Sequence, residues 1–308
     1  MAQHNDEVTG SPLDRRRFLA KTAIGVGSLS SLSMGLASKS AHAQAIEPST
    51  GGGIPGLVMR EREPSNLEFP FSSLDGPIVP THRFFVRSHF AIPKIDVSQW
   101  RLEIDGAVEK PISLSYEEFK KLPSKTLAAT IECAGNSRGF LVPKASGVLW
   151  EFGGIGNAEW TGVSLSDVLE RAGIREGAVE VVLEGSDTGS INSDPKSPGE
   201  VHFERSLPLD KAKRPEVILA YKMNGKELTP EHGFPVRAVV AGWYGMASVK
   251  WLRRLTVTTT PFLGFWQTSQ YSYWKRVDGR PSLVPVTEMQ VKSSIARPGL
   301  HEQVRSGT

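Results

Sequence analysis

The chain has a single cysteine, Cys133, among its 308 residues. One cysteine cannot form an internal disulfide, so the fold must depend on its apolar core. It also excludes a four-cysteine iron–sulfur cluster and a C-x-x-C-H haem attachment site, and no haem is expected in this chain. Cys133 is therefore either an inert buried thiol or a ligand or nucleophile, and any redox chemistry requires a different cofactor.

Long apolar runs are also missing. The best candidate, residues 23–37, is interrupted by Gly and Ser and is shorter than the roughly 18 residues that a membrane span needs. Three arginines at 15–17 and a Phe-Leu pair precede this run, and Ala41-His42-Ala43 follows as a small-residue cleavage site. This order indicates a cleaved export signal over residues 1–43 and no stable membrane anchor. The alternatives are an ordinary export signal for unfolded chains and the twin-arginine type, which the paired arginines with Phe-Leu favour.

A surplus of charge of one sign is absent as well. The sequence has 36 Lys and Arg against 33 Asp and Glu, and residues 1–43 hold five of the basic and three of the acidic residues. The expected mature chain thus carries a net charge of only +1, which gives no reason to expect nucleic-acid binding. Because the twin-arginine route carries folded proteins, we expect a periplasmic protein whose cofactor is inserted before export.

The sequence contains no G-x-G-x-x-G or phosphate-loop motif, so a nicotinamide or nucleotide enzyme is not expected. Repeats and low-complexity runs are absent from residues 67–308. Strand patterns outnumber helical ones there, which predicts an α+β fold with mixed β-sheets and short helices. We expect a Gly- and Pro-rich linker over 44–66, the main domain over 67–260 and a C-terminal extension over 261–308.

Two Ser-initiated segments predict the helices. Ser115 and Glu118 match a capping box that opens a short helix, and Ser164 is expected to cap a second helix that runs to Gly173. The predicted strands, with a hairpin turn at Asn224-Gly225, lie at 101–106, 126–132, 178–184, 217–223, 235–240 and 248–258.

Cys133 follows directly on the predicted strand 126–132 and enters the turn Ala134-Gly135-Asn136. A residue at a strand end lies where backbone donors are free and where loops carry functional groups. This position favours the ligand or nucleophile interpretation over an inert thiol.

Six segments together resemble the molybdenum-cofactor domain of the sulfite oxidase family, which includes bacterial sulfite dehydrogenases. These segments, in chain order, are Phe85–His89, Ile131–Arg138, Leu183–Asp187, Ala220–Gly225, His232–Arg237 and Ser248–Leu252. The combination of Cys-Ala-Gly-Asn with His-Gly-Phe-Pro-Val-Arg and Val-Lys-Trp-Leu is the most specific part. The resemblance implies a sulfite-oxidase-type molybdopterin-binding fold, with 67–260 as the catalytic domain.

The resemblance also implies a molybdenum–molybdopterin cofactor, in which a pterin dithiolene and one protein thiolate hold the metal. Thiolate is a soft ligand that suits such a metal, and Cys133 is the candidate. The cofactor contacts implied by the family pattern are His89, Asp187, His232, Arg237, Ser248 and Lys250. Arg237 and Lys250 suit a phosphate, as a fork and a point charge, and Asp187 suits the pterin ring nitrogens.

For the substrate, the family pattern implies Arg87 and Arg138 as recognition residues and Trp150 as a pocket wall, beside Cys133. Each guanidinium would attract an oxyanion by about 4 kcal/mol at 4 Å before desolvation is subtracted. The expected reaction is oxidation of a small sulfur oxyanion, sulfite to sulfate, with electrons passed to an external acceptor such as a c-type cytochrome. The alternatives are a periplasmic reductase of sulfoxides or related oxo compounds, and a cofactor-binding protein without turnover.

The chain departs from the family pattern in the pocket. Gly279 stands where alignment places the family's pocket tyrosine, and Tyr271 or Tyr273 is a candidate substitute. Ser137 stands where the family has an arginine.

The C-terminal extension is a second departure, because the family continues into an immunoglobulin-like dimerisation domain. We expect that domain to be absent or vestigial and the protein to be a monomer. The aromatic residues between 262 and 274 either pack in the core or dock a partner.

Overall fold

The computed structural model describes residues 56–299 and 302–305. The expected export signal and the first part of the expected linker lie outside these residues. All the described residues belong to one compact unit.

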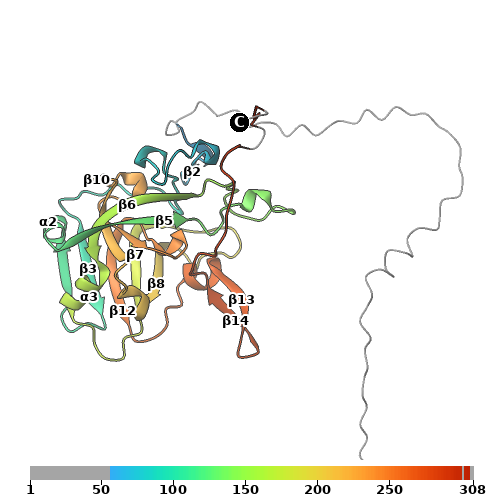
Figure 1. The fold of residues 1–308 in the computed structure, drawn as a ribbon. Coiled ribbons are helices and arrows are strands. Elements are labelled where there is room, and N and C mark those ends of the chain that lie inside the picture. Colours follow the sequence, from blue (N-terminus) through green and yellow to red (C-terminus); the bar gives the residue numbers. More distant parts are fainter. Residues whose placement is uncertain (1–55, 300–301, 306–308) are drawn as a thin grey trace, which may run out of the picture. The chain divides into compact units, whose positions relative to one another are not determined.

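Two five-stranded sheets form most of this unit (Figure 1). The first has the order β4 (Ile112–Ser115), β3 (Arg101–Gly106), β12 (Leu252–Thr258), β7 (Glu180–Gly189) and β8 (Val201–Pro208). The second has the order β10 (Lys226–Glu227), β9 (Val217–Met223), β6 (Ile155–Ser164) and β5 (Ser124–Glu132), with β11 (Arg237–Val240) also paired to β9. The β3–β12 pair is parallel and the other pairs of both sheets are antiparallel. The predicted α+β fold with mixed sheets is confirmed.

The helices are short. The α-helices are α2 (Tyr116–Lys120), α3 (Leu165–Ala172) and α4 (Leu209–Ala212), and the tighter or wider helical turns are η1 (Phe71–Ser73), η2 (Thr81–Arg83), η3 (Arg138–Phe140), η4 (Pro230–His232), η5 (Gly245–Ala247) and the π-helix η6 (Trp266–Gln270). The capping box predicted at Ser115 is present. Ser164 does precede α3, but its side chain makes no capping bond, so that part of the prediction is wrong. No helix in the described part of the chain has the length and apolar character of a membrane span.

The segment 248–251 differs from the predicted strand 248–258, because β12 begins only at Leu252. Trp251 adopts a left-handed backbone conformation, with φ of 51°, and its indole donates to the carbonyl of Pro230 over 2.7 Å. Ser248 accepts a hydrogen bond from the amide of Val240. This irregular segment carries Lys250 and brings it to the cavity described below.

The linker prediction is wrong for its described part, which contains β1 (Val58–Glu61) and the start of β2 (Asn66–Glu68). The two strands pair as an antiparallel hairpin, and β2 is buried throughout. Side-chain hydrogen bonds explain why this segment is ordered. The Asn66 amide donates to Glu61 and to the carbonyl of Pro64, so a segment rich in turn residues is held by its own side chains.

The boundary expected at residue 260 does not coincide with a break in packing. Trp266 is 3% exposed and belongs to the main apolar core, and Gln267 is buried beside it. After η6 the chain forms the hairpin β13 (Ser272–Val277) and β14 (Arg280–Pro285), which projects from the sheets in Figure 1. Within the residues described after β14, no immunoglobulin-like sandwich follows.

Two apolar cores pack against these sheets. One gathers around Trp100, Phe119 and Leu255, and the other around Trp150 and Trp160 and includes Cys133. The cavity described next takes lining residues from both cores, so it lies where the two cores meet.

Candidate functional site

One cavity brings together most of the residues singled out in the sequence. Its volume is about 650 Å3, open solvent at the mouth included. Of the ten predicted site residues, those that line it are Arg87, His89, Cys133, Asp187, His232, Arg237, Ser248 and Lys250. These side chains come from segments as far apart in sequence as 87 and 250, and only the fold places them in one lining. Arg138 and Trp150 do not line the cavity.

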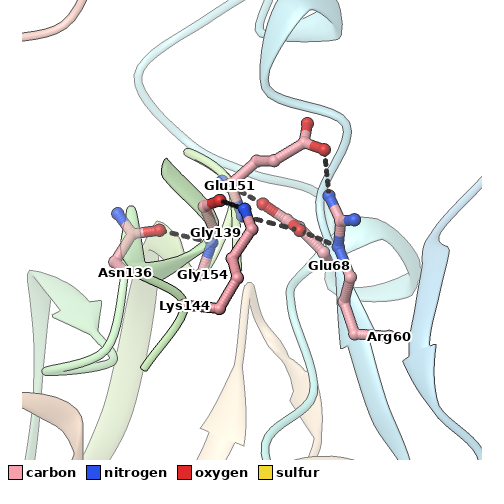
Figure 2. Close-up of polar contacts among 8 residues, drawn as sticks. Arg60, Glu68, Asn136, Gly139, Lys144, Glu151 and Gly154 are labelled. Atoms are coloured by element: carbon pink, nitrogen blue, oxygen red, sulfur yellow. Dashed lines mark hydrogen bonds and ion pairs between the residues drawn. The ribbon is translucent and has the colours of Figure 1, made fainter. Parts of the chain in front are cut away.

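Cys133 lies one residue after β5, as predicted, and it is 9% exposed. Its amide donates to the carbonyl of Gly154 over 2.8 Å, and its carbonyl accepts from the amide of Asn136 over 2.9 Å. The Asn136 side chain closes this turn, because its oxygen accepts from the Gly154 amide (Figure 2). Its nitrogen donates to Glu132. The thiol is thus held on a turn whose polar groups are satisfied on both sides.

A second layer of polar contacts supports the segment behind Cys133. Glu68 of β2 accepts from the amides of Glu151 and Gly153, and it pairs with Arg60, which also pairs with Glu151 over 3.0 Å (Figure 2). The hairpin that the sequence suggested was linker therefore holds the 151–154 segment against the Cys133 turn. Nothing in the sequence pattern singled out Glu68 or Asn136 for this role.

Arg237 is fully buried among backbone carbonyls. It donates to the carbonyls of His232 and Ser248 over 3.1 Å each and to that of Ala238 over 3.3 Å, and its guanidinium stacks over Trp160. Burial lowers its pKa to about 9. Among the described residues Arg237 has no carboxylate in an ion pair, so its charge is available to an anion in the cavity.

Lys250 is a second buried cation of the same kind. Its ammonium donates to the Glu231 carbonyl over 2.9 Å and to the Ser88 hydroxyl over 3.2 Å, and lies 4.1 Å from the centre of the Trp251 ring. Burial, then the positive charge of Arg237, lowers its pKa well below the ordinary lysine value. A lysine and an arginine held this way favour a bound phosphate, which would supply the missing negative charge.

Asp187 supplies the carboxylate of the lining. It is 3% exposed, and its Oδ1 is buried with no hydrogen-bond partner. Burial raises its pKa to about 7, against the opposing effect of Lys250. A buried carboxylate oxygen without a donor is unusual in a folded protein, and a ligand with ring N–H groups would satisfy it.

The two histidines of the lining are both neutral near pH 7. The Nε2 of His232 lies 2.9 Å from the carbonyl of Thr81, which can only accept, so this nitrogen carries the proton. Burial lowers the pKa of His232 to about 3. Burial, with the charges of Arg87, Lys250 and Arg205, also holds the pKa of His89 well below its usual value.

Of the two candidate tyrosines, Tyr271 is the one that lines the cavity. Its hydroxyl is hydrogen bonded to Nε2 of His89, and the ring of His89 stacks on Phe203 at 4.1 Å. Tyr273, in contrast, is half exposed on the projecting hairpin. Burial raises the pKa of Tyr271 above that of a free tyrosine, while the charge of Arg87 opposes the shift.

Arg205 is a site-supporting residue that sequence reasoning missed. It is 1% exposed, and it donates to the carbonyls of Trp266 and Val286 over 2.9 and 3.0 Å. These bonds hold both ends of the segment that carries Tyr271, and the guanidinium lies 5.7 Å from the centre of the Tyr271 ring. A lone arginine in strand β8 gives no signal for this role in the sequence.

Arg87 is held from the N-terminal hairpin. It donates to the side-chain oxygen of Asn66 over 3.2 Å and to the carbonyl of Ser88, and the same Asn66 oxygen accepts from the Ser88 amide. Asn66 is completely buried. The sequence placed Asn66 in a linker, so its contact with a cavity residue could not be predicted.

Arg138 and Trp150 lie outside the lining. The Arg138 guanidinium fits beside two glycines: a Cβ on Gly147 would come within 2.1 Å of it and one on Gly135 within 2.6 Å. Its charge still reaches the cavity, because it helps to lower the pKa of Tyr271. The prediction that Trp150 forms a pocket wall is wrong: Trp150 is fully buried and packs edge-to-face on Phe85, the ring that does line the cavity.

The residues present fit a molybdenum–molybdopterin group. Across the described residues no three His, Cys, Asp or Glu side chains form a metal site, so a metal beside Cys133 would need most of its ligands from a non-protein group. A dithiolene provides such ligands. The two unpaired cations fit a phosphate, and the orphaned oxygen of Asp187 fits ring donors.

The chain matches the oxidoreductase molybdopterin binding domain over residues 89–266. Sulfite oxidase from Gallus gallus is 37% identical over 259 residues, which cover 79% of this chain and 54% of that protein. Nitrate reductase (NADH) 1 from Arabidopsis thaliana is 34% identical, over 79% of this chain and 28% of its own length. The solved structure of the sulfane dehydrogenase SoxCD from Paracoccus pantotrophus matches with a TM-score of 0.65 and 32% identity, over 77% of this chain and 58% of that one.

The chain thus spans about half the length of the sulfite oxidases that it matches. The matched region includes the cavity residues from His89 to Lys250. The sequence match, the shared fold and the fit of the cavity agree: the chain belongs to the sulfite oxidase family, with an oxidoreductase molybdopterin-binding domain.

Proposed function

We propose that this protein is an exported molybdenum–molybdopterin enzyme that oxidises a small sulfur oxyanion, sulfite to sulfate, and passes the electrons to an external c-type cytochrome. The observation that carries the proposal is the content of one cavity: a single thiol, two buried cations without carboxylate partners and an orphaned carboxylate oxygen. The sulfite oxidases and the sulfane dehydrogenase among its relatives support a sulfur substrate. Export rests on the N-terminal signal pattern.

Different cavity residues would hold different parts of the cofactor. Cys133 would provide the protein thiolate, Arg237 and Lys250 would hold the phosphate, and Asp187 would accept from the pterin ring. Neutral His232 and Ser248 would add uncharged hydrogen-bonding groups beside them. When bound, the group supplies two-electron oxygen-atom transfer, which no protein side chain can provide.

The substrate side would recognise an oxyanion by charge and hydrogen bonding. Arg87 is fixed by Asn66, so its guanidinium is oriented before the anion arrives. Tyr271 keeps its proton because burial raises its pKa, and its hydroxyl can donate either to His89 or to an oxygen of the substrate. The rings of Phe203 and Trp266 pack against His89 and fix its orientation beside Tyr271.

Nitrate reduction is a second candidate, because nitrate reductases match this chain at 33–34% identity. Nitrate is also a small oxyanion, and the charges of the cavity do not distinguish it from sulfite. The experiment below also distinguishes two further alternatives, reduction of sulfoxides or related oxo compounds and cofactor binding without turnover.

The test is sulfite-dependent reduction of cytochrome c by the purified protein, with its molybdenum content quantified. Near-stoichiometric molybdenum with turnover would support the proposal. If the protein contains molybdenum but turns over only nitrate or a sulfoxide, with a chemical reductant as electron donor, that compound would replace sulfite as the proposed substrate. Molybdenum without any turnover would favour a binding protein, and absence of molybdenum would overturn the cofactor assignment.

A further inference from the structure

The described segment after β14 contacts the loop that forms part of the cavity lining. The Tyr244 amide donates to the Thr287 carbonyl and the Met289 amide donates to the Gly242 carbonyl, each over 2.9 Å. Trp243 and Glu288 form a bridge between the two segments. The loop so held continues into Gly245 and Met246, which line the cavity. Residues 286–292, named the strap below, therefore hold one side of the site.

The strap ends in an ion pair next to the thiol. Lys292 pairs with Glu132, the residue that immediately precedes Cys133. The Glu132 side chain is only 3% exposed, whereas that of Lys292 is 39% exposed. Among the described residues, Lys292 is the one cation that forms an ion pair with Glu132. A buried carboxylate thus depends on a partly exposed lysine for its compensation.

Glu132 acts on Cys133 through the turn and not through the cavity. Ile131 and Cys133 line the cavity and Glu132 does not, as expected from the alternation of side chains along a strand. The Glu132 carboxylate accepts from the Asn136 side chain over 2.9 Å, and Asn136 holds Gly154, whose carbonyl holds the Cys133 amide. Gly245 of the strapped loop packs on the Glu132 backbone, since a Cβ there would lie 3.1 Å from the Glu132 carbonyl oxygen.

We propose that Lys292 is a positioning residue for the thiolate ligand: it compensates the buried carboxylate of Glu132 and thereby fixes the Asn136 turn that orients Cys133. This role rests on the proposed molybdenum function. An unpaired buried carboxylate is costly, so without Lys292 the strand end would rearrange to hydrate Glu132. The Cys133 turn would move with it, because Glu132 and Cys133 are adjacent.

A set of variants separates charge compensation of Glu132 from simple anchoring of the strap. Lys292→Met removes the cation and leaves the carboxylate. The double variant Glu132→Gln with Lys292→Met removes both charges, and the Gln carbonyl can still accept from Asn136. Lys292→Arg keeps the charge. Lys275→Met, on the exposed strand β13, is the matched control for loss of one lysine.

The experiment measures molybdenum per chain, the absorption band of thiolate-to-molybdenum charge transfer, and kcat and KM for sulfite in the full-length protein. We expect Lys292→Met to lower molybdenum affinity or kcat by about tenfold and to shift the charge-transfer band. Tenfold is the lower end of the loss that is typical when a residue that orients a metal ligand is replaced. Lys292→Arg and the double variant should recover most of both, and Lys275→Met should match the wild type.

Two results would overturn the role of Lys292. One is a Lys292→Met protein with the wild-type band and turnover. The other is a double variant as impaired as Lys292→Met, because strap anchoring alone would then explain the loss. Failure of the proposed function is distinct: wild-type protein without molybdenum would reject that function, and the role of Lys292 with it, before any variant is compared.

Discussion

The cavity has two walls that differ in how they are built. After the roles proposed above, we name Asp187, His232, Arg237 and Lys250 the cofactor wall, and Arg87, His89 and Tyr271 the substrate wall. His89, expected from the sequence as a cofactor contact, is grouped with the substrate wall because it is hydrogen bonded to Tyr271. In the cofactor wall, backbone carbonyls accept from both cations: Arg237 donates to the carbonyls of His232 and Ser248, and Lys250 donates to that of Glu231. In the substrate wall, side chains from remote segments hold one another.

In the substrate wall, the bonded residues are far apart in the sequence. Arg87 is fixed by Asn66, and His89 is bonded to Tyr271, which is 182 residues away. Both walls depend on the fold, because Lys250 and His232 of the cofactor wall also bond to the remote Ser88 and Thr81. They differ in the groups that hold them: mostly backbone carbonyls in the cofactor wall, and mainly side chains in the substrate wall. Substitutions in the first should change cofactor loading, whereas substitutions in the second should change turnover of loaded protein.

Cys133→Ser has the largest expected effect, because Cys133 lines the same cavity as both walls and would provide the metal ligand. We expect turnover to fall by more than about 100-fold, the upper end for changes at a metal site, since a serine hydroxyl is a poor ligand for a metal that prefers soft sulfur. Turnover and molybdenum content of the purified variant measure this. Retention of full sulfite turnover would reject Cys133 as the ligand.

Lys250→Met tests the cofactor wall. We expect a loss of about 10- to 100-fold in molybdenum affinity, with Lys213→Met, an exposed lysine, as the control. Loaded Lys250→Met protein should keep the KM of the wild type for sulfite. A changed KM with normal molybdenum content would contradict the separation of the two walls.

The same residue predicts a pH dependence in protein prepared without cofactor. Burial holds the pKa of Lys250 well below its unfolded value, so between these two pKa values the unfolded chain binds more protons. The free energy of unfolding should therefore rise with pH across this window, up to the ordinary lysine pKa of about 10.4. Lys250→Met should flatten the rise, as measured by denaturant unfolding at several pH values. An unchanged slope in the variant would show that Lys250 does not cause it.

The contrast between the walls also explains which parts of the site the sequence could predict. Arg237 and Lys250 stand in compact motifs whose residue types already suit a phosphate, and the structure places both in the cavity lining. Asn66 and Arg205 act on the site through long-range contacts, and nothing in their neighbouring residues indicates them. Trp150 was misplaced because a motif gives no information on which of two adjacent aromatic rings faces the cavity.

The fold shows the same division. The capping box at Ser115 and the hairpin turn at Asn224-Gly225 are local signals, and both were predicted correctly; Asn224 and Gly225 have φ of 49° and 78°. The β1–β2 hairpin was missed because no alternating apolar pattern marks it: Asn66 bonds to Glu61 and Pro64 within the hairpin, and Glu68 bonds to Gly153 in a distant segment. The strand predicted at 248–258 was too long, because β12 begins at Leu252 and Trp251 before it has a left-handed backbone conformation.

Tyr271→Phe tests the substrate wall. Loss of one hydrogen bond to a charged ligand costs about 1.5–3 kcal/mol, so we expect kcat/KM for sulfite to fall by about tenfold or more at normal molybdenum content. Tyr273→Phe is the matched control on the exposed side of the hairpin and should change kcat/KM little. Equal effects of the two substitutions would contradict the assignment of Tyr271 to the substrate wall.

Arg138→Met should have the smallest effect of the series and sharpens the boundary of the substrate wall. Arg87 lines the cavity and Arg138 does not, yet the charges of both lower the pKa of Tyr271. Removing Arg138 should leave the guanidinium of Arg87 in contact with the anion. KM for sulfite should therefore rise by only a few-fold, because solvent and salt screen the attraction of a charge that does not contact the anion. Because Tyr271 is expected to hold its proton already, the pH profile of kcat/KM should keep its shape.

Arg87→Met, measured beside Arg138→Met at matched molybdenum content, should raise KM by much more, since it removes the charge that lines the cavity. If Arg138→Met raised KM as much as Arg87→Met, Arg138 would have to contact the substrate directly, and the substrate wall would extend across the glycines that now enclose its side chain.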